Sequence, residues 1–226
     1  TAPVPMPVPQ ITQGGTGEQT ELTRCLQKAV DLGMQGKSKL QPEVVRMIGM
    51  SGVKYRHMIN NLIELLSDAR YLEIGSWAGS TMCSAINGNA LSAFAIDNWS
   101  EFGDVATYFL RNVGGAINKE VKFSMRTADF REVDYAHLGG KFNVYLFDGP
   151  HEENDQYEGV SIAMPALDKE YILIVDDYNF HRVQKGTQRA ISDMKLEVLL
   201  SYEILTTPDG THPDPAVSMQ NSEWHN

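Results

Sequence analysis

Short apolar runs alternate with longer amphipathic stretches through the centre of this chain. The apolar runs predict five strands, which cover Arg70 to Gly75, Leu91 to Asp97, Glu120 to Arg126, Phe142 to Asp148 and Tyr171 to Asp177. A helical or loop segment follows each strand, and this alternation is typical of a parallel sheet with helices on its faces. The pattern therefore predicts an α/β, Rossmann-like fold, with a last strand near residues 197–207.

The residues before the first strand follow a different pattern. Residues 18–68 are expected to form an N-terminal helical cap, with breaks near residues 33–39 and 49–52. Residues 1–17 alternate proline with small or apolar residues and then carry glycines, which favours an extended arm. This arm is either a loose terminus or a segment that joins copies in a homo-oligomer. Residues 69–226 are left as the main domain.

A glycine turn is predicted where the first strand runs into the next helix. The sequence is Tyr71-Leu-Glu-Ile-Gly-Ser-Trp-Ala-Gly-Ser80, with the pattern Glu73-x-Gly75-x-x-x-Gly79. Trp77 stands where a dinucleotide fingerprint has a glycine that lets the backbone approach a pyrophosphate. A nucleoside without a diphosphate therefore fits the turn better. The candidate cofactor-binding residues here are Glu73, Gly75, Ser76, Trp77, Gly79 and Ser80.

Acidic residues end the later strands. Ligands of an open parallel sheet bind outside the carboxyl ends of its strands, so these positions are the ones that can carry chemistry. Asp97 follows Glu73 by 24 residues, and it is placed either to accept hydrogen bonds from both ribose hydroxyls or to cap the following helix.

Asp148, Asp176 and Asp177 end two strands that we expect to be neighbours. Three converging carboxylates repel one another, and a hard divalent cation stabilises their charged form. Mg²⁺ is the expected ion, with Mn²⁺ or Ca²⁺ as alternatives. A second interpretation is that some of these acids cap helices or bind the cofactor. Asp148 is a candidate both for metal binding and for cofactor binding.

Two sets of motifs resemble known families. The Glu73-x-Gly-x-x-x-Gly79 turn resembles the first motif of class I S-adenosylmethionine (SAM) methyltransferases. The combination of Asp148-Gly-Pro-His151, Gln156-Tyr-Glu-Gly-Val160 and Val175-Asp-Asp-Tyr178 resembles metal-dependent O-methyltransferases of the macrocin type, which modify sugars of natural products. The resemblance implies SAM as cofactor and places the metal ligands at Asp148, Asp176 and Asp177.

The same resemblance suggests roles for other residues. His151 corresponds to the general base, although a loop histidine bonded to backbone is the alternative. Asp129 matches the position that holds the adenine amino group, with Phe130 available to stack, or it is an ordinary loop aspartate. Trp77 packs on the methionine portion of SAM or is hydrophobic filler. His57, Tyr55 and Arg56 lie in the cap, where core packing or exposure is the simpler interpretation.

Class I methyltransferases normally close with an antiparallel hairpin, yet residues 211–226 give little strand signal. The final strand is therefore either short, around Ala216 to Met219, or missing because the chain is truncated.

Composition narrows the function further. The 19 Lys and Arg against 29 Asp and Glu give a net charge of −10 over 226 residues, which opposes nucleic-acid partners and suits cations such as SAM or a divalent metal. The apolar runs are too short to span a membrane, and a cytoplasmic location is expected. The leading hypothesis is a SAM-dependent, metal-dependent O-methyltransferase acting on a small hydroxylated molecule. A metal-independent methyltransferase and a non-catalytic nucleoside-binding module are the alternatives.

Overall fold

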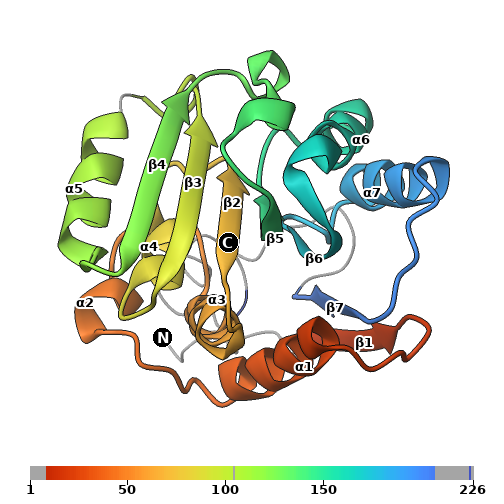
Figure 1. Cartoon of the computed structure of the whole chain (residues 1–226), viewed down its shortest axis with the longest axis horizontal. Coiled ribbons are helices and arrows are strands. Elements are labelled where there is room, and N and C mark those ends of the chain that lie inside the picture. The colour runs from red at the N-terminus through yellow and green to blue at the C-terminus, as the bar shows by residue number, and fades with distance from the viewer. Residues whose placement is uncertain (1–8, 104, 207–223, 225–226) are drawn as a thin grey trace, which may run out of the picture.

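A five-stranded parallel sheet forms the centre of the protein (Figure 1). The computed structural model describes residues 9–103, 105–206 and 224. The strand order is β4-β3-β2-β5-β6. The strands are β2 Arg70–Ile74, β3 Leu91–Asp97, β4 Val121–Thr127, β5 Phe142–Phe147 and β6 Leu167–Val175. The predicted α/β fold with a mostly parallel sheet is confirmed.

Helices precede the sheet and separate its strands. The α-helices are α1 Glu21–Met34, α2 Pro42–Val45, α3 Val53–Leu65, α4 Ser80–Ile86, α5 Ala106–Ala116, α6 Glu153–Ile162 and α7 His181–Asp193. Three short 3-10 helices are η1 Phe130–Glu132, η2 Tyr135–His137 and η3 Met164–Ala166. The first three α-helices fall within residues 18–68, whereas the division into arm, cap and main domain stays a prediction. In the described part of the chain, no helix is long and apolar enough to cross a membrane.

The two faces of the sheet bury separate hydrophobic clusters, because successive side chains of a strand point to opposite faces. Tyr71 and Leu146 belong to the cluster that includes residues of α1, α3, α4 and α5. Leu72 and Tyr145 belong to the other cluster, together with Phe130. Glu73 therefore points from β2 toward the face that α3 covers. This alternation brings the glycine turn and the helical cap together.

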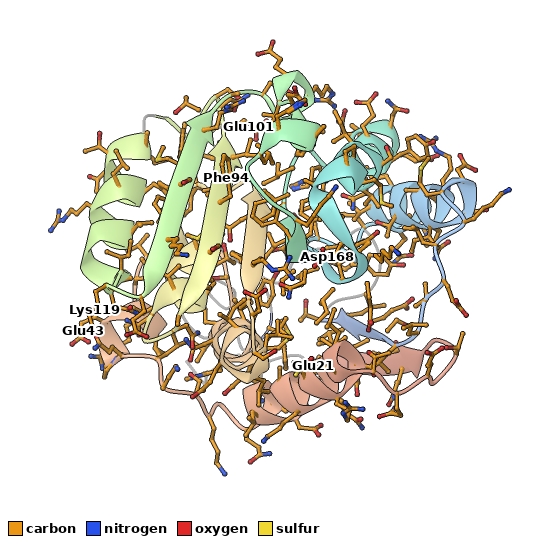
Figure 2. The ribbon with its side chains drawn as sticks, viewed as in Figure 1. Glu21, Glu43, Phe94, Glu101, Lys119 and Asp168 are labelled. Carbon is orange, nitrogen blue, oxygen red and sulfur yellow. The ribbon has the colours of Figure 1, made fainter. Side chains whose placement is uncertain are left out.

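Charged side chains surround this core. Figure 2 shows Glu43, Glu101 and Lys119 at the periphery of the molecule, and all three are exposed. Phe94, by contrast, lies on β3 and packs edge-on against Phe142, with ring centroids 6.3 Å apart. The polar exterior and apolar sheet faces follow the hydrophobic pattern of the sequence.

The last described strand corrects one expectation. β7, Ser201–Leu205, lies within the predicted residues 197–207 but does not join the parallel sheet. It pairs antiparallel with β1, Gln10–Gly14, in the register Gln10↔Leu205. Tyr202 and Ile204 pack against the cluster that includes α1 and α3, so their burial holds β7 on the cap side. The segment Ala216 to Met219 lies outside the described residues.

Candidate active site

The glycine turn after β2 requires glycine for two separate reasons. Gly75 has φ +83°, a left-handed conformation that costs other residues energy. A Cβ atom on Gly75 would also lie only 1.7 Å from the carbonyl oxygen of Asp148, so β5 leaves no room for a side chain. Gly79 has φ +86°, and a Cβ there would lie 2.8 Å from the ring of Phe109. The approach at Gly75 brings the ends of β2 and β5 together, and the approach at Gly79 lets α5 pack against the turn.

Two buried polar atoms at this turn make no well-aligned hydrogen bond within the described part of the chain, although the Ser76 and Thr81 side chains interact with the Glu73 carboxylate. The two atoms are Oε1 of Glu73 and Oγ of Ser76. Burial raises the pKa of Glu73 to about 7, against the opposing effect of the Tyr71, Ser76 and Thr81 hydroxyls, of which that of Tyr71 donates to Glu73 at 2.5 Å. Buried polar groups normally have partners, and a bound ligand is one explanation for such orphans. The turn therefore fits a polar cofactor.

Asp97 accepts hydrogen bonds from two loops. Its Oδ2 accepts from the backbone N–H of Trp77 at 2.8 Å, and its Oδ1 accepts from that of Trp99 at 2.7 Å. The Trp99 indole N–H in turn donates to the Trp77 carbonyl oxygen at 3.0 Å. Trp77 has φ +41°, and its ring lies edge-on to Phe102 at 6.3 Å. Asp97 thus fixes the glycine turn to the loop after β3, and each oxygen retains a lone pair for a ribose hydroxyl.

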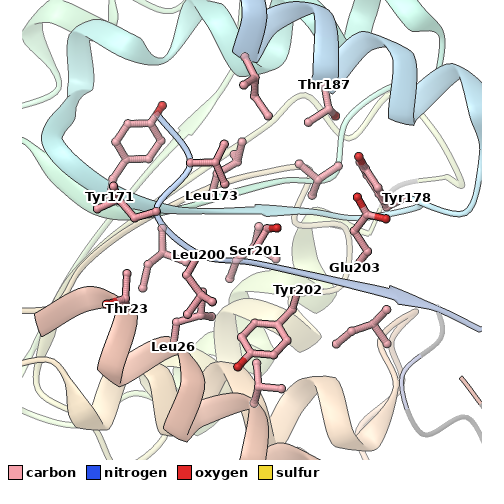
Figure 3. Close-up of a pocket in the computed structure, with 18 of the residues that line it drawn as sticks. Thr23, Leu26, Tyr171, Leu173, Tyr178, Thr187, Leu200, Ser201, Tyr202 and Glu203 are labelled. Carbon is pink, nitrogen blue, oxygen red and sulfur yellow. The ribbon is translucent and has the colours of Figure 1, made fainter. Parts of the chain in front are cut away.

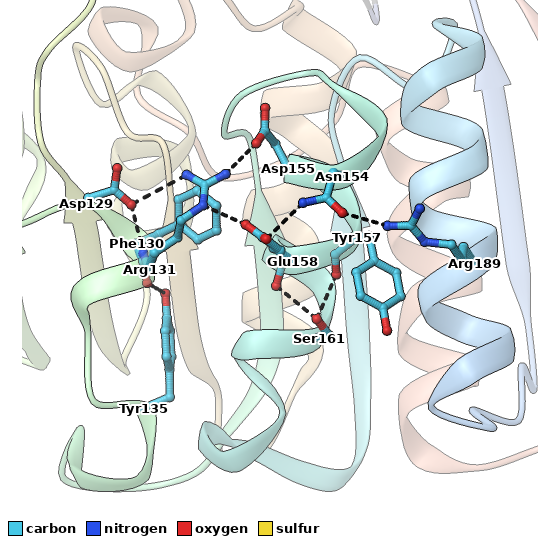
Figure 4. A network of polar contacts seen from close by, with 10 residues as sticks. All are labelled: Asp129, Phe130, Arg131, Tyr135, Asn154, Asp155, Tyr157, Glu158, Ser161 and Arg189. Carbon is cyan, nitrogen blue, oxygen red and sulfur yellow. Dashed lines mark hydrogen bonds and ion pairs between the residues drawn. The ribbon is translucent and has the colours of Figure 1, made fainter.

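Asp129 lies in a surface network of charges (Figure 4). Its Oδ1 accepts from the Arg131 N–H at 2.9 Å and lies 3.6 Å from the Arg131 guanidinium. Arg131 also pairs with Asp155 and Glu158. Phe130 is buried, and its ring meets that of Phe147 edge-on at 5.4 Å. In this arrangement Asp129 caps the loop and Phe130 packs in the core, and the adenine role of both residues stays a prediction.

An aspartate–histidine cluster lies where β5 and β6 end. His151 Nε2 is 2.8 Å from Asp177 Oδ2 and 3.9 Å from Asp148 Oδ1. Asp148, His151 and Asp177 offer ligand atoms that all lie within 4.8 Å of one another, and two carboxylates with an imidazole fit a divalent cation. The neighbouring carboxylates of Asp148 and Asp177 raise the pKa of His151 to about 10, and burial raises that of Asp148 to about 6. In this arrangement His151 is protonated at neutral pH.

Asp176, the remaining predicted metal ligand, is not a member of that cluster. Its Oδ1 accepts the backbone N–H of Asp177 at 2.8 Å. Asp177 has φ +51°, so its backbone turns sharply after β6 and its side chain points toward Asp148 and His151. The structure therefore brings two of the three predicted ligands together with the predicted base.

A loop of the cap packs directly on the start of α4. The Ser51 hydroxyl donates to the Ser80 hydroxyl at 2.7 Å, and a Cβ on Gly49 would lie 2.2 Å from that of Ser80. Buried Arg56 holds this loop by donating to the carbonyl oxygens of residues 44, 45, 47, 49 and 51. Sequence reasoning did not find this role, because carbonyl oxygens that surround a cation carry no residue signature.

A cavity of about 690 Å³ borders the site (Figure 3). It lies between β6 and β7, with α1 on one side and α7 on the other. Leu26, Leu173 and Leu200 are among its apolar lining residues, whereas Tyr55 and Asp177 line it near the end of β6. The cavity thus reaches the aspartate–histidine cluster at Asp177 and continues into a mainly apolar space of ligand size.

A family model described as "Methyltransferase domain" matches residues 72–178. This match covers 107 of the 226 residues and includes the glycine turn, the aspartate–histidine cluster and Asp176. That segment is similar to a methyltransferase domain. No curated protein matches the sequence.

Several solved structures resemble the fold, each with 13% sequence identity. Cofactor-bound Rv0187 from MTB has a TM-score of 0.47, and the match covers 84% of this chain and 92% of that one. An O-methyltransferase candidate from Klebsiella pneumoniae has a TM-score of 0.44, with 80% of each chain covered. The SAH complex of SMU.776 has a TM-score of 0.47, with 60% of this chain covered; this chain spans 40% of that one.

Proposed function

We propose that this protein is a SAM-dependent O-methyltransferase that uses a divalent metal and acts on a small hydroxylated molecule, such as a sugar or a glycosylated metabolite. The observation that carries the proposal is the glycine turn in the segment that matches the methyltransferase model, where Oε1 of Glu73 and Oγ of Ser76 are buried without a well-aligned hydrogen bond. These two oxygens and the tight approach of Gly75 to β5 suit the amino-acid end of SAM. Asp97 would hold the ribose hydroxyls.

Asp148 and Asp177 are the residues that would hold the metal, with Asp176 as the third predicted ligand. A bound divalent cation lowers the pKa of an acceptor hydroxyl and so helps it to lose a proton. The chain's own contribution is to hold acceptor, methyl group and sulfur in line. The cavity between β6 and β7 supports this role, because its end reaches Asp176 and Asp177.

His151 remains the proposed base, and the structure sets a condition on that role. The carboxylates of Asp148 and Asp177 that would hold the metal are the same ones that contact His151. His151 is protonated in this arrangement, so the imidazole must lose its proton and leave Asp177 before it can accept a proton from the acceptor. His151→Ala is expected to reduce turnover more than acceptor affinity, as initial-rate kinetics would measure. Unchanged turnover would place the base elsewhere.

Calorimetry tests the cofactor assignment without any acceptor. SAM should bind and NAD should not, and Asp97→Ala should weaken SAM binding because the proposed ribose contact is lost. Asp177→Ala should largely spare SAM affinity. Binding of NAD in preference to SAM would contradict the proposal.

Mn²⁺ titration followed by electron paramagnetic resonance tests the metal assignment. The signal of free Mn²⁺ should fall with one equivalent of protein, and Asp148→Ala and Asp177→Ala should each abolish this binding. Asp176→Ala reports whether the third carboxylate takes part. Equal Mn²⁺ binding by the wild-type protein and Asp177→Ala would remove this metal site.

The His151–Asp177 contact favours a second candidate, a metal-independent methyltransferase. In such an enzyme the His151 imidazolium, rather than a metal, would neutralise the carboxylates of Asp148 and Asp177. Treatment with EDTA separates the two candidates. Full activity after EDTA treatment supports the metal-independent enzyme, whereas activity restored only by added Mg²⁺ or Mn²⁺ supports the metal-dependent one.

A further inference from the structure

One buried hydroxyl of the cap has no structural role in the described part of the chain. Tyr55, on α3, is 7% exposed, and its hydroxyl makes no hydrogen bond with any described residue. Other buried tyrosines are paired: the Tyr71 hydroxyl donates to Glu73 at 2.5 Å, and the Tyr145 hydroxyl donates to the Gly159 carbonyl oxygen at 2.7 Å. Burying a hydroxyl without a partner destabilises the folded state, so folding alone does not explain a tyrosine here.

The position of Tyr55 points toward the candidate active site. It packs in the cluster that contains Tyr71, on the face of the sheet to which Glu73 belongs. It also lines the cavity beside Asp176 and Asp177. Burial and the charges of Asp176, Asp148, Glu73 and Asp177 raise its pKa well above the usual value, so it remains a neutral phenol. Its oxygen therefore adds lone pairs to a strongly negative region.

Such a region selects the positive groups of SAM. In the sheet order β3-β2-β5-β6, Asp97 ends β3, whereas Asp148 and Asp176 follow β5 and β6 on the other side of the glycine turn. With ribose at Asp97, the amino-acid end and sulfonium would lie toward β5 and β6. The carboxylate of SAM would be repelled there, whereas its ammonium and sulfonium would be attracted.

We propose that the Tyr55 hydroxyl oxygen binds a cationic group of SAM, so that the cap contributes directly to the cofactor site. This inference rests on the proposed function. Tyr55 lies before residue 72, where the methyltransferase match begins, so the domain motifs do not include it.

Calorimetric binding of three cofactor analogues to Tyr55→Phe tests the inference, in buffer with EDTA so that no metal contributes. SAM carries both cations, S-adenosylhomocysteine keeps only the ammonium, and methylthioadenosine has neither. SAM affinity should fall about 10-fold, and methylthioadenosine affinity should not change. A parallel loss for S-adenosylhomocysteine assigns the contact to the ammonium, and an unchanged value assigns it to the sulfonium.

Tyr145→Phe is the matched control, because it removes a buried hydroxyl that has a partner. It should lower the Tm and leave SAM affinity unchanged, whereas Tyr55→Phe should leave the Tm of the ligand-free protein unchanged or raise it. SAM affinity of Tyr55→Phe within two-fold of the wild type overturns the inference, as does an equal loss for methylthioadenosine. Failure of the wild-type protein to bind SAM is a separate result, which removes the proposed function and this inference with it.

Discussion

Gly75 carries the tightest constraint that a single residue places on the site. Its φ of +83° and the carbonyl oxygen of Asp148, which would lie 1.7 Å from a Cβ atom at this position, both exclude a side chain. Gly75→Ala is therefore expected to cost more than about 4 kcal/mol in the free energy of unfolding, because β2 and β5 must separate. Urea denaturation followed by circular dichroism measures this loss.

Gly36 provides the control for backbone strain alone. Its φ is +61°, and nothing lies within 4 Å of a Cβ at this position. Gly36→Ala should cost roughly 1–2 kcal/mol, the energy of a left-handed alanine. Equal losses at Gly36 and Gly75 would show that φ, and not the approach of Asp148, makes Gly75 necessary.

Glu73 makes stability depend on pH. Its folded pKa of about 7 exceeds its ordinary value of 4.5, so the folded protein binds more protons than the unfolded chain between these values. Stability should therefore fall as pH rises from 4.5 to 7 and level off above that, by up to about 3 kcal/mol. Glu73→Gln should lack this component, which denaturation of the cofactor-free proteins across pH would show. An identical pH slope in both proteins would mean that Glu73 is ionised in the fold.

At the residue scale, sequence reasoning succeeded where the backbone imposes the choice. Gly75 and Gly79 could be predicted, because a strand followed by a glycine turn has a local pattern. The roles of Tyr55 and Arg56 could not, since they depend on whether a hydroxyl finds a partner and on which carbonyl oxygens surround a guanidinium. The contacts of Asp129 with Arg131 could not be predicted either, because they depend on how the loop after β4 folds.

At the scale of elements, the loop between α2 and α3 depends on Arg56. The buried guanidinium donates to five carbonyl oxygens, and desolvation lowers its pKa to about 10, so it stays charged at neutral pH. Arg56→Met should cost about 3 kcal/mol or more, because several buried carbonyl oxygens lose their donor. It should also weaken SAM binding through loss of the Ser51–Ser80 contact. Urea denaturation and calorimetry measure these two effects.

Two further variants sharpen this prediction. Arg56→Lys should recover only part of the loss, since an ammonium cannot reproduce the planar fork of donors. Arg46→Met changes a side chain of the same loop that makes none of these contacts, and should alter stability by less than about 0.5 kcal/mol. Full stability in Arg56→Lys would show that charge alone, without guanidinium geometry, holds the loop.

The elements themselves followed from the sequence when their side chains alternated clearly. The prediction for β3, Leu91–Asp97, matches the structure, whereas β6 begins at Leu167 rather than Tyr171. Its first residues include Asp168, Lys169 and Glu170. Because these residues are charged, the apolar run that predicted the strand begins only after them. The pairing of β1 with β7 was also missed, because it rests on backbone hydrogen bonds between segments about 190 residues apart. Such long-range pairing leaves no local signal.

At the scale of the whole molecule, the candidate site joins the cap to the sheet. Ser51 and Tyr55 come from the cap, whereas Glu73 and Asp148 come from the ends of β2 and β5. A ligand that binds all of them links two parts of the fold and stabilises both against opening. The net charge of −10 further favours a cationic ligand over an anionic one.

SAM is therefore expected to stabilise the protein as one unit. At 100 times its Kd it should add about 2.7 kcal/mol, which corresponds to a Tm increase of roughly 5–10 °C for a chain of this size. Hydrogen exchange should slow in α3 as well as in β2, because the ligand contacts both. NADH at the same concentration should change neither quantity, since Trp77 and the acidic surroundings oppose its diphosphate. Protection limited to β2, with α3 exchanging as before, would show that the cap is not part of the cofactor site.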